Sequence, residues 1–432
     1  MERYSEYKDS GVKWLGQIPS HWEVRHLRNF LTLFSEKGFG NCQLLSVTRE
    51  NGVILRDKDN KEENHNYVPD DLSGYKHLKA GDFVINKMKS WQGSYGVSDY
   101  EGIVSPAYFT CKLRGVIPSF FSRAIRSKAY VGFFMQYSKG IRVDQWDLDP
   151  NSMKDIPFVL PKEEEQDAIV AYLETATSKI DAAIAQQQKM IDLLNERKQI
   201  IINNAVTKGL DPDVPMKDSG IEWIGKIPEH WEISQLKRVV KLTNGDRGSN
   251  YPSGDDIKDY GVIFVTADNI HNLELDIITS AKYITEEKYN ILRGAKLKIG
   301  DIIFCLRGAG YGNCAINKMF NSGTIASSLV CITPQGINSE FLNYVLHSNF
   351  LRDQENVSSN GSCADNVSAQ DLGSYIVTIP PVSEQKDIVD AIVHFCVPID
   401  EAVKCSEEMI KMLQERKQII INDVVTGKVK VV

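Results

Sequence analysis

One stretch of this chain occurs twice, and the repetition limits what the chain can fold into. Residues 161–208 return as residues 380–427, 219 positions later, and the octapeptide ERKQIIIN is identical in both copies. Apolar side chains in each copy alternate at spacings of four and three, the heptad pattern of a helix that packs along another helix. The resulting helix seam comprises Leu173, Ile180, Ile184, Ile191, Leu194 and Ile201 in the first copy, and Ile392, Ile399, Val403, Ile410, Leu413 and Ile420 in the second.

The duplicated seam predicts two long helices that pack against each other as an antiparallel coiled coil. Its polar interruptions recur as well, as Thr177 with Cys396, Gln187 with Ser406 and Lys198 with Lys417. Repetition that extends to these breaks is expected of a pseudo-twofold helix pair; two unrelated amphipathic helices on separate cores are the alternative. Pro398 lacks the N–H that a helix interior uses, so we expect a short helix, a break, and a long helix over about 179–206 and about 398–425.

A second block is repeated ahead of each helix. Residues 8–24 read KDSGVKWLGQIPSHWEV and residues 217–233 read KDSGIEWIGKIPEHWEI, and we call these two segments the clasps. Their Gly and Pro positions exclude a continuous helix and predict an irregular segment with turns. Tryptophans at repeated positions of such a segment are typical of interface anchors. The candidate contacts for partner subunits are therefore Trp14, Trp22, Trp223 and Trp231, with packing inside the chain as the alternative.

Two regions between clasp and helix, about 29–158 and 239–378, share little identity but keep common landmarks. LKAGDFVIN at 78–86 matches LKIGDIIFC at 297–305, and each predicts a Gly-Asp turn followed by a buried strand. The tripeptide SYG at 94–96 resembles GYG at 310–312, and SPAYFT at 105–110 takes the place of ASSLVC at 326–331. We expect the two regions to share one fold with different contents, as a common scaffold with two specificities would.

Both regions carry local positive charge, although the formal net charge of the chain is −7. The window 76–142 contains eleven Lys and Arg against three Asp and Glu, and the window 288–318 contains six against one. Cations can contact phosphates, and interleaved amides and aromatics can contact base edges. The candidate DNA-binding residues are Lys87, Lys89, Trp91, Gln92, Tyr95, Arg142, Arg307, Tyr311 and Asn313. A solvated basic face over core aromatics is the alternative.

Other signals argue against several classes of function. The eight cysteines show no CxxC spacing or Cys/His grouping, so no metal site is expected. There is no GxxxxGK[ST] loop, and GAGYG at 308–312 lacks the following helix and acidic residue of a dinucleotide site. The opening MERYSEYKDS has no apolar signal region, and no run of about eighteen apolar residues occurs. We therefore expect no catalytic residues, no cofactor bound by this chain, no membrane association and a cytoplasmic location.

The clasp KDSGxxWxGxIPxHWE, the Gly-Asp strand and the motif PxxxEQxxIV at the start of a long helix each occur twice. This combination resembles the specificity (S) subunit of prokaryotic type I restriction-modification systems, over nearly the whole chain. The resemblance implies a non-catalytic subunit in which each variable region is a target recognition domain for one half of a split DNA sequence. It implies double-stranded DNA, two methyltransferase (modification) subunits and restriction (motor) subunits as partners. S-adenosylmethionine, ATP and Mg would then be bound by those partner subunits.

The expected fold class is α+β, with mixed α/β target recognition domains, two long antiparallel coiled-coil helices and a pseudo-twofold internal repeat. The expected domains are clasp plus recognition domain at 1–158, a helical spacer at 159–209, clasp plus recognition domain at 210–378, and a helical spacer at 379–432. Two other functions are kept open. A coiled-coil scaffold for protein ligands would show no salt-dependent DNA affinity, and a self-contained nuclease or methyltransferase would need its own donor or metal site.

Overall fold

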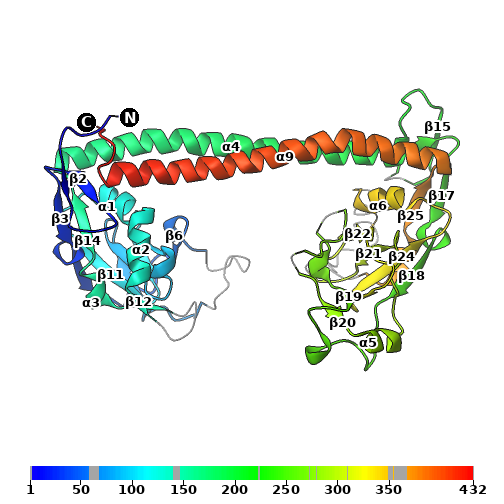
Figure 1. Cartoon of the computed structure of the whole chain (residues 1–432), viewed down its shortest axis with the longest axis horizontal. Coiled ribbons are helices and arrows are strands. Elements are labelled where there is room, and N and C mark those ends of the chain that lie inside the picture. Colours follow the sequence, from blue (N-terminus) through cyan, green and yellow to red (C-terminus); the bar gives the residue numbers. More distant parts are fainter. Residues whose placement is uncertain are drawn as a thin grey trace. The chain divides into compact units, whose positions relative to one another are not determined.

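The chain forms two compact units in a computed structural model (Figure 1). The structure describes residues 2–431 except 58–67, 140–145, 222–223, 272, 279, 309, 349–353 and 355–366. Unit 1 comprises residues 1–188 and 407–432, and unit 2 comprises residues 189–406. The two long helices, α4 (Glu163–Lys208) and α9 (Val382–Val425), each contribute one part to each unit. No helix in these described ranges is long and apolar enough to cross a membrane.

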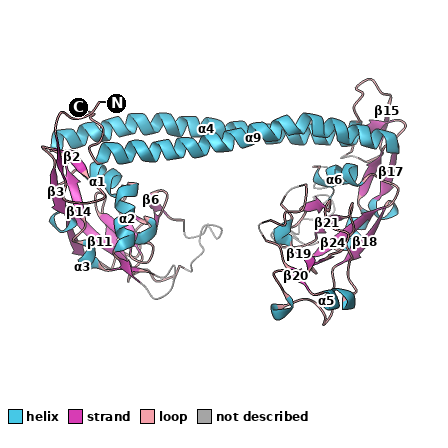
Figure 2. Ribbon diagram, in the orientation of Figure 1, coloured by secondary structure: helices cyan, strands magenta, loops and turns pink. Residues whose placement is uncertain are grey.

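Unit 1 is built around a four-stranded antiparallel sheet in the order β4-β11-β8-β9. Figure 2 shows the strands of this unit in magenta, with β11 labelled. The strands of unit 1 are β1 (Tyr7–Asp9), β2 (Gln17–Pro19), β3 (Glu23–His26), β4 (Leu31–Phe34), β5 (Leu45–Thr48), β6 (Gly52–Leu55), β7 (Lys76–Leu78), β8 (Phe83–Asn86), β9 (Tyr95–Val97), β10 (Gly102–Val104), β11 (Tyr108–Leu113), β12 (Ser138–Lys139), β13 (Asp147–Leu148) and β14 (Pro157–Leu160). Its shorter helices are α1 (Pro118–Ile125), α2 (Lys128–Gln136) and α3 (Pro150–Met153).

Unit 2 repeats this sheet in the order β18-β24-β21-β22. Its strands are β15 (Met216–Asp218), β16 (Lys226–Pro228), β17 (Glu232–Gln235), β18 (Val240–Asn244), β19 (Val262–Val265), β20 (Tyr283–Ile284), β21 (Ile302–Cys305), β22 (Cys314–Ile316), β23 (Thr324–Ile325), β24 (Leu329–Pro334) and β25 (Ile376–Ile379). Its shorter helices are α5 (Glu286–Ile291), α6 (Ser339–His347) and α8 (Ala369–Ser374). The mixed helix and sheet fold confirms the expected fold class.

The Gly-Asp turns build the same strand in both units. Gly81 and Gly300 adopt φ of 89° and 90°, a left-handed conformation that glycine tolerates without strain. The Asp82 carboxylate then accepts the N–H of Lys79 at 2.8 Å, and the corresponding bond in unit 2 has the same length. Each turn leads into a fully buried strand, β8 or β21. The predicted turn and strand are therefore present twice.

Strand register corrects one part of the predicted alignment. Phe83 pairs with Val97 in unit 1, and Ile302 pairs with Ile316 in unit 2, so β9 corresponds to β22 at an offset of 219 residues. SYG at 94–96 therefore corresponds to residues 313–315, and the match to GYG at 310–312 was wrong. The residues that look alike in sequence occupy different positions of the loop. The pairing of SPAYFT with ASSLVC agrees with the registers of β11 and β24.

The long helices are continuous, which contradicts the expected break. α4 runs through Lys179 and α9 runs through Pro398 without interruption. Pro398 removes one backbone hydrogen bond, but Cys396 and Ile399 on either side of it are both buried in the seam. The Pro398 ring is exposed, so it does not disturb that packed face. Burial on both flanks stabilises the helix where proline disfavours it.

The two helices run antiparallel within each unit, as predicted. In unit 1 the Lys417 ammonium lies 2.6 Å from the Asp181 carboxylate, and in unit 2 Lys198 lies 2.5 Å from Asp400. These pairs occupy equivalent positions of the repeat, so each seam lysine reaches an aspartate on the other helix. All twelve seam residues are buried or half-buried. Apolar burial rather than these solvent-exposed ion pairs supplies most of the stabilisation.

In each unit, the end of one long helix packs against the clasp. In unit 1 the end of α9 approaches the first clasp so closely that a Cβ on Gly427 would lie 3.1 Å from the Trp22 ring. In unit 2 the end of α4 approaches the second clasp, where a Cβ on Gly209 would lie 3.3 Å from Trp231. The N–H of Lys430 also donates to the carbonyl of Glu2 at 2.9 Å, so the two ends of the described chain meet in unit 1 (Figure 1).

Candidate DNA interface

The loop that follows β8, residues 87–94, carries four of the predicted DNA-binding residues. Its first residue is tied to β13, because Leu148 donates its N–H to the Lys87 carbonyl at 3.0 Å. The Lys87 ammonium also pairs with the Asp147 carboxylate at 3.0 Å. Lys87 is therefore partly neutralised and positions the loop, in which Met88 and Lys89 are exposed.

The middle of this loop combines a cation, an amide and aromatic rings. The indoles of Trp91 and Trp146 lie 5.2 Å apart, centroid to centroid, at an interplanar angle of 55°. Lys89 and Met88 are exposed beside this pair, and Gln92 is half-buried. An ammonium can contact a phosphate, a glutamine amide can pair with adenine, and an apolar side chain can contact the methyl group of thymine. The loop therefore presents the chemistry that direct readout requires.

One predicted residue of unit 1, Tyr95, does not join this surface. Tyr95 is fully buried, and its hydroxyl has no hydrogen-bond partner among the described residues. Burial raises the pKa of Tyr95, so its phenol stays neutral. Its ring packs on Phe134 at 4.1 Å, which makes it a core residue and makes its assignment to DNA wrong. Arg142 lies outside the described residues.

The equivalent loop of unit 2, residues 306–313, has the same length but a different composition. Arg307 is exposed, and Tyr311 is half-buried. Asn313 is exposed, and its amide donates to the Ile270 carbonyl at 3.5 Å, a weak bond that leaves it available to a ligand. An exposed guanidinium can bind guanine or a phosphate through two parallel hydrogen bonds. The three predicted residues therefore share one loop.

Sequence reasoning missed Met88 and Trp146. Met88 was overlooked because an apolar residue between two lysines carries no charge signal. Trp146 is separated from Trp91 by 55 positions, so nothing local connects them, although the Trp146-Asp147 pair near the end of the basic window was visible. Their proximity to the loop comes from the tertiary fold.

The clasp tryptophan of unit 1 is an internal anchor. Trp22 is fully buried, and its indole N–H donates to the Glu165 carboxylate at 3.0 Å. His21 Nε2 lies 3.0 Å from the same oxygen, and the Tyr4 hydroxyl donates to the other oxygen at 2.5 Å. We call the bond between Trp22 and Glu165 the latch of unit 1. It joins the clasp to the first turn of α4.

Unit 2 contains the same latch. Trp231 is fully buried and donates to the Glu384 carboxylate at 3.0 Å, while His230 lies 2.8 Å from its second oxygen. The prediction that Trp22 and Trp231 contact partner subunits is therefore wrong, because both side chains are fully buried. The repeated glutamate and tryptophan are explained by a hydrogen bond inside each unit.

The predicted partner contacts of the other two clasp tryptophans are not contradicted by the structure. Trp14 is 38% exposed and packs edge-on against Phe133 at 4.2 Å and Tyr130 at 5.5 Å. Its assignment as a partner contact stays a prediction. Trp223 lies outside the described residues.

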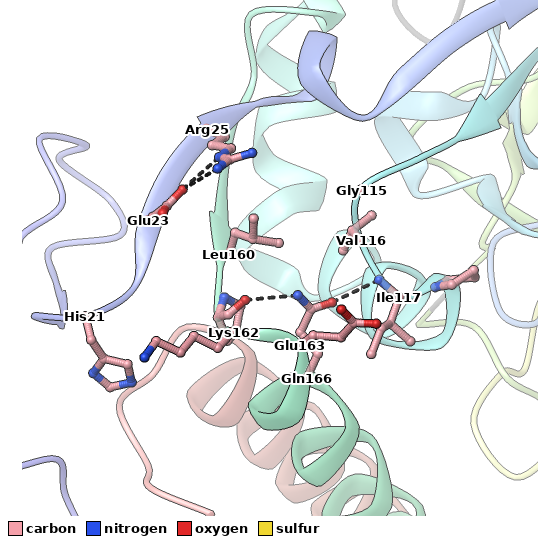
Figure 3. A pocket seen from close by; sticks show the side chains of 12 residues that line it. His21, Glu23, Arg25, Gly115, Val116, Ile117, Leu160, Lys162, Glu163 and Gln166 are labelled. Carbon is pink, nitrogen blue, oxygen red and sulfur yellow. Dashed lines mark hydrogen bonds and ion pairs between the residues drawn. The ribbon is translucent and has the colours of Figure 1, made fainter.

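The glutamine of the EQ motif joins each long helix to the start of a shorter helix, α1 in unit 1 and α6 in unit 2. Gln166 donates to the Pro161 carbonyl and accepts the N–H of Ile117, both at 2.9 Å, at the edge of an open pocket of about 580 Å³ (Figure 3). Gln385 makes the equivalent bonds in unit 2, to Pro380 at 2.8 Å and from Asn338 at 2.7 Å. The pocket of unit 1 is lined by His21, Glu23, Arg25, Gly115, Val116, Ile117, Pro118, Leu160, Pro161, Lys162, Glu163 and Gln166.

This pocket offers mixed charge rather than catalytic chemistry. Arg25 pairs with Glu23 across its wall at 2.7 Å, and both are largely exposed. The Gln166 amide is already occupied by backbone groups. Within the described ranges, no three His, Cys, Asp or Glu side chains gather in a way that could hold a metal ion.

Comparison with known proteins identifies relatives of this chain. The family model described as "Type I restriction modification DNA specificity domain" matches residues 228–399. The MjaVIII specificity subunit, a type I restriction enzyme component of Methanocaldococcus jannaschii, is 22% identical and covers 98% of this chain and 97% of the relative. The putative type I restriction enzyme MjaX specificity subunit of the same organism is 23% identical and covers 98% of each chain.

A solved structure shares the fold. Described as "Structural basis underlying complex assembly and conformational transition of the type I R-M system", it covers 95% of this chain and 99% of the matched chain. The TM-score is 0.66 and the sequence identity is 15%, so this likeness concerns the fold.

Proposed function

Because the chain belongs to the specificity subunits of type I restriction-modification systems, we propose that its two units read the two halves of a split DNA target. A specificity subunit is the non-catalytic recognition component of such a system, so this chain is not itself the enzyme. The observation that carries the proposal is a shared sheet whose corresponding loops differ. Residues 87–94 and 306–313 follow equivalent strands in the same register.

The loops differ in the side chains that would meet base edges. Lys89 and Gln92 of unit 1 correspond to Gly308 and Tyr311 of unit 2 at the offset of 219. The N–H of Gln92 donates to the Lys89 carbonyl at 3.1 Å, and the N–H of Tyr311 donates to the Gly308 carbonyl at 2.9 Å. The same backbone turn thus presents different hydrogen-bonding groups. Two different half-sites around an unread spacer are the expected target.

The methylated sequence of a host carrying this chain with its modification subunits tests the proposal. We expect one motif with two dissimilar specified halves separated by unspecified positions, because each unit contacts bases only at its own loops. Sequencing of methylated genomic DNA measures it, and the same host without this chain is the control. A contiguous or palindromic motif would contradict the assignment of one half-site to each unit.

The partners we propose are two modification subunits, with restriction subunits added to that core. Methyl transfer to a base extruded from the duplex would take place on the modification subunits. S-adenosylmethionine, ATP and Mg would be bound by those partners. Support for two equal docking sites comes from the repeat itself, because a surface that occurs twice can hold two copies of one partner.

One exposed apolar stripe occurs in each unit at equivalent positions of the repeat. Its members directly precede seam residues and are between 40% and 58% exposed. The stripe of unit 2 is Met190, Leu193 and Ile200 on α4, and the stripe of unit 1 is Met409, Met412 and Ile419 on α9. Clustered exposed apolar side chains of this kind mark protein interaction sites. We assign each stripe to one modification subunit.

Substitution of aspartate into one stripe is expected to remove one modification subunit from the complex. Leu193→Asp and Met412→Asp change equivalent exposed positions, so each should reduce the bound copies from two to one. Losing the burial of one such side chain, about 1.5–3 kcal/mol, weakens that site at least about tenfold. Light scattering of the purified complex measures the stoichiometry.

The chain offers matched controls for this experiment. Asn195→Asp and Gln414→Asp add the same charge at exposed positions two residues further along each helix. Both should keep two copies bound. Full stoichiometry in the Leu193→Asp and Met412→Asp double variant would show that the stripes are not docking sites.

A further inference from the structure

A second loop lies beside the candidate reading loop at the same edge of each sheet. In unit 2, β18 and β21 both run antiparallel to β24, so they run in the same direction and end at the same edge. The N–H of Gly245 donates to the Leu329 carbonyl at 3.3 Å, and the N–H of Leu306 donates to the Ser328 carbonyl at 2.9 Å. The loops that begin at residues 245 and 306 therefore flank the start of β24.

The second loop of unit 2 is built rigidly around Asp246. Its carboxylate accepts the N–H groups of Gly248 and Arg293, each at 2.8 Å. These backbone hydrogen bonds hold the pKa of Asp246 below its usual value, so the carboxylate stays ionised and the bonds persist. A Cβ on Gly294 would lie 2.4 Å from the Asp246 nitrogen, which shows how closely the two segments are packed.

This construction exposes two arginines. Arg247 and Arg293 are both exposed, and neither guanidinium makes a hydrogen bond or ion pair with the described part of the chain. The carboxylate of Asp246, which adjoins Arg247 in the chain, is occupied by the backbone N–H groups of Gly248 and Arg293. Two unpaired guanidinium groups on a fixed backbone suit a ligand with several phosphate oxygens.

Unit 1 has a cation in the corresponding place. β4 and β8 both run antiparallel to β11, so their following loops also share one sheet edge. Lys37 is exposed on the loop after β4. The Lys76 ammonium donates to the carbonyl of Tyr108, at the start of β11, at 2.5 Å, and burial followed by the positive charge of Lys37 lowers the pKa of Lys76. An exposed lysine such as Lys37 can contact a phosphate.

We propose that the loop after the first strand of each sheet binds DNA phosphates, through Arg247 and Arg293 in unit 2 and through Lys37 in unit 1. This inference rests on the proposed function and adds a second contact to each recognition surface. Phosphate contacts fix the register of a protein on the duplex without reading sequence. The second loop would therefore hold the DNA while the loop at 87–94 or 306–313 reads the bases.

Salt-dependent binding of the full chain to a mixed-sequence DNA duplex tests the inference. Each lost phosphate contact makes the plot of log affinity against log salt less steep by about 0.9. We expect Arg247→Ala combined with Arg293→Ala to reduce the slope by about 2, and Lys37→Ala by about 1. The combined Arg247→Lys and Arg293→Lys variant keeps both charges and should restore the slope.

Matched controls lie at the opposite edge of each sheet. Lys79 and Lys298 are exposed, occupy equivalent positions before β8 and β21, and should leave the slope unchanged when replaced by alanine. A wild-type slope in the double arginine variant would overturn the inference, as would equal losses in the control variants. A wild-type chain without salt-dependent DNA binding would instead overturn the proposed function itself.

Discussion

Exchange of residues 29–158 for the equivalent region of a type I specificity subunit is expected to replace one half of the proposed DNA target and leave the other half intact. Base readout is local, since each good bidentate contact between a side chain and a base contributes about 1–3 kcal/mol of discrimination. The loops at 35–41 and 87–94 both lie on the exchanged segment. Sequencing of the methylated motif, with the modification subunits present, measures the change.

The structure gives a physical reason why this segment can be exchanged. Its two ends are held side by side, because the N–H of Leu27 donates to the Ile156 carbonyl at 2.9 Å and the N–H of Arg28 donates to the Lys154 carbonyl at 3.0 Å. The adjoining strands β3 and β14 pair antiparallel. An inserted region therefore starts and ends at one place on the scaffold, and the helices need not move to accept it.

The reciprocal exchange provides the control. Unit 2 holds the ends of its own region together in the same way, with the N–H of Leu236 donating to the Tyr375 carbonyl at 2.8 Å. Exchange of residues 239–378 should change only the other half of the target. If either exchange alters both halves together, or alters neither, recognition is not divided between the two regions.

Trp22→Ala is expected to destabilise unit 1 by about 3–5 kcal/mol, the usual loss for a large aromatic side chain in a core. Trp22 is fully buried between the clasp and the end of α9, next to Gly427. Its removal leaves a cavity and deprives Glu165 of a hydrogen-bond donor. Urea unfolding followed by circular dichroism measures the change in free energy.

Trp14→Ala is the matched control, because it removes the same side chain from the same clasp. Trp14 is partly exposed, and its main contact is the edge-on pair with Phe133. The loss of that aromatic pair is expected to cost about 0.5–1.5 kcal/mol beyond the lost burial. If Trp22→Ala left stability unchanged but abolished binding of the modification subunits, the latch would be a docking contact after all.

Because of the repeat, many features of the fold could be predicted from the sequence. Helix seams such as Leu173 to Ile201 follow from local periodicity, because every residue of a long helix has a fixed angular position. The turns at Gly81 and Gly300 follow from the conformational freedom of glycine. The candidate DNA-binding loops were predicted from charge and from the duplicated strand before them. These features depend on neighbours a few positions apart in the chain.

Tertiary packing decided the features that depend on distant residues. Tyr95 and Trp22 carry polar groups at suggestive positions, yet both are buried, because they contact Phe134 and Glu165, which lie far away in the sequence. Pro398 stays inside a helix because buried neighbours outweigh its lost hydrogen bond.

The second loop at each sheet edge likewise depends on the tertiary structure and not on the local sequence. Nothing in the sequence around Arg247 relates it to Arg307, because the two loops meet only through the pairing of β18 and β21 with β24. Periodicity and turn chemistry are local and can be read along the chain. Burial and proximity are set by which strands and helices pair, and only the folded structure determines them.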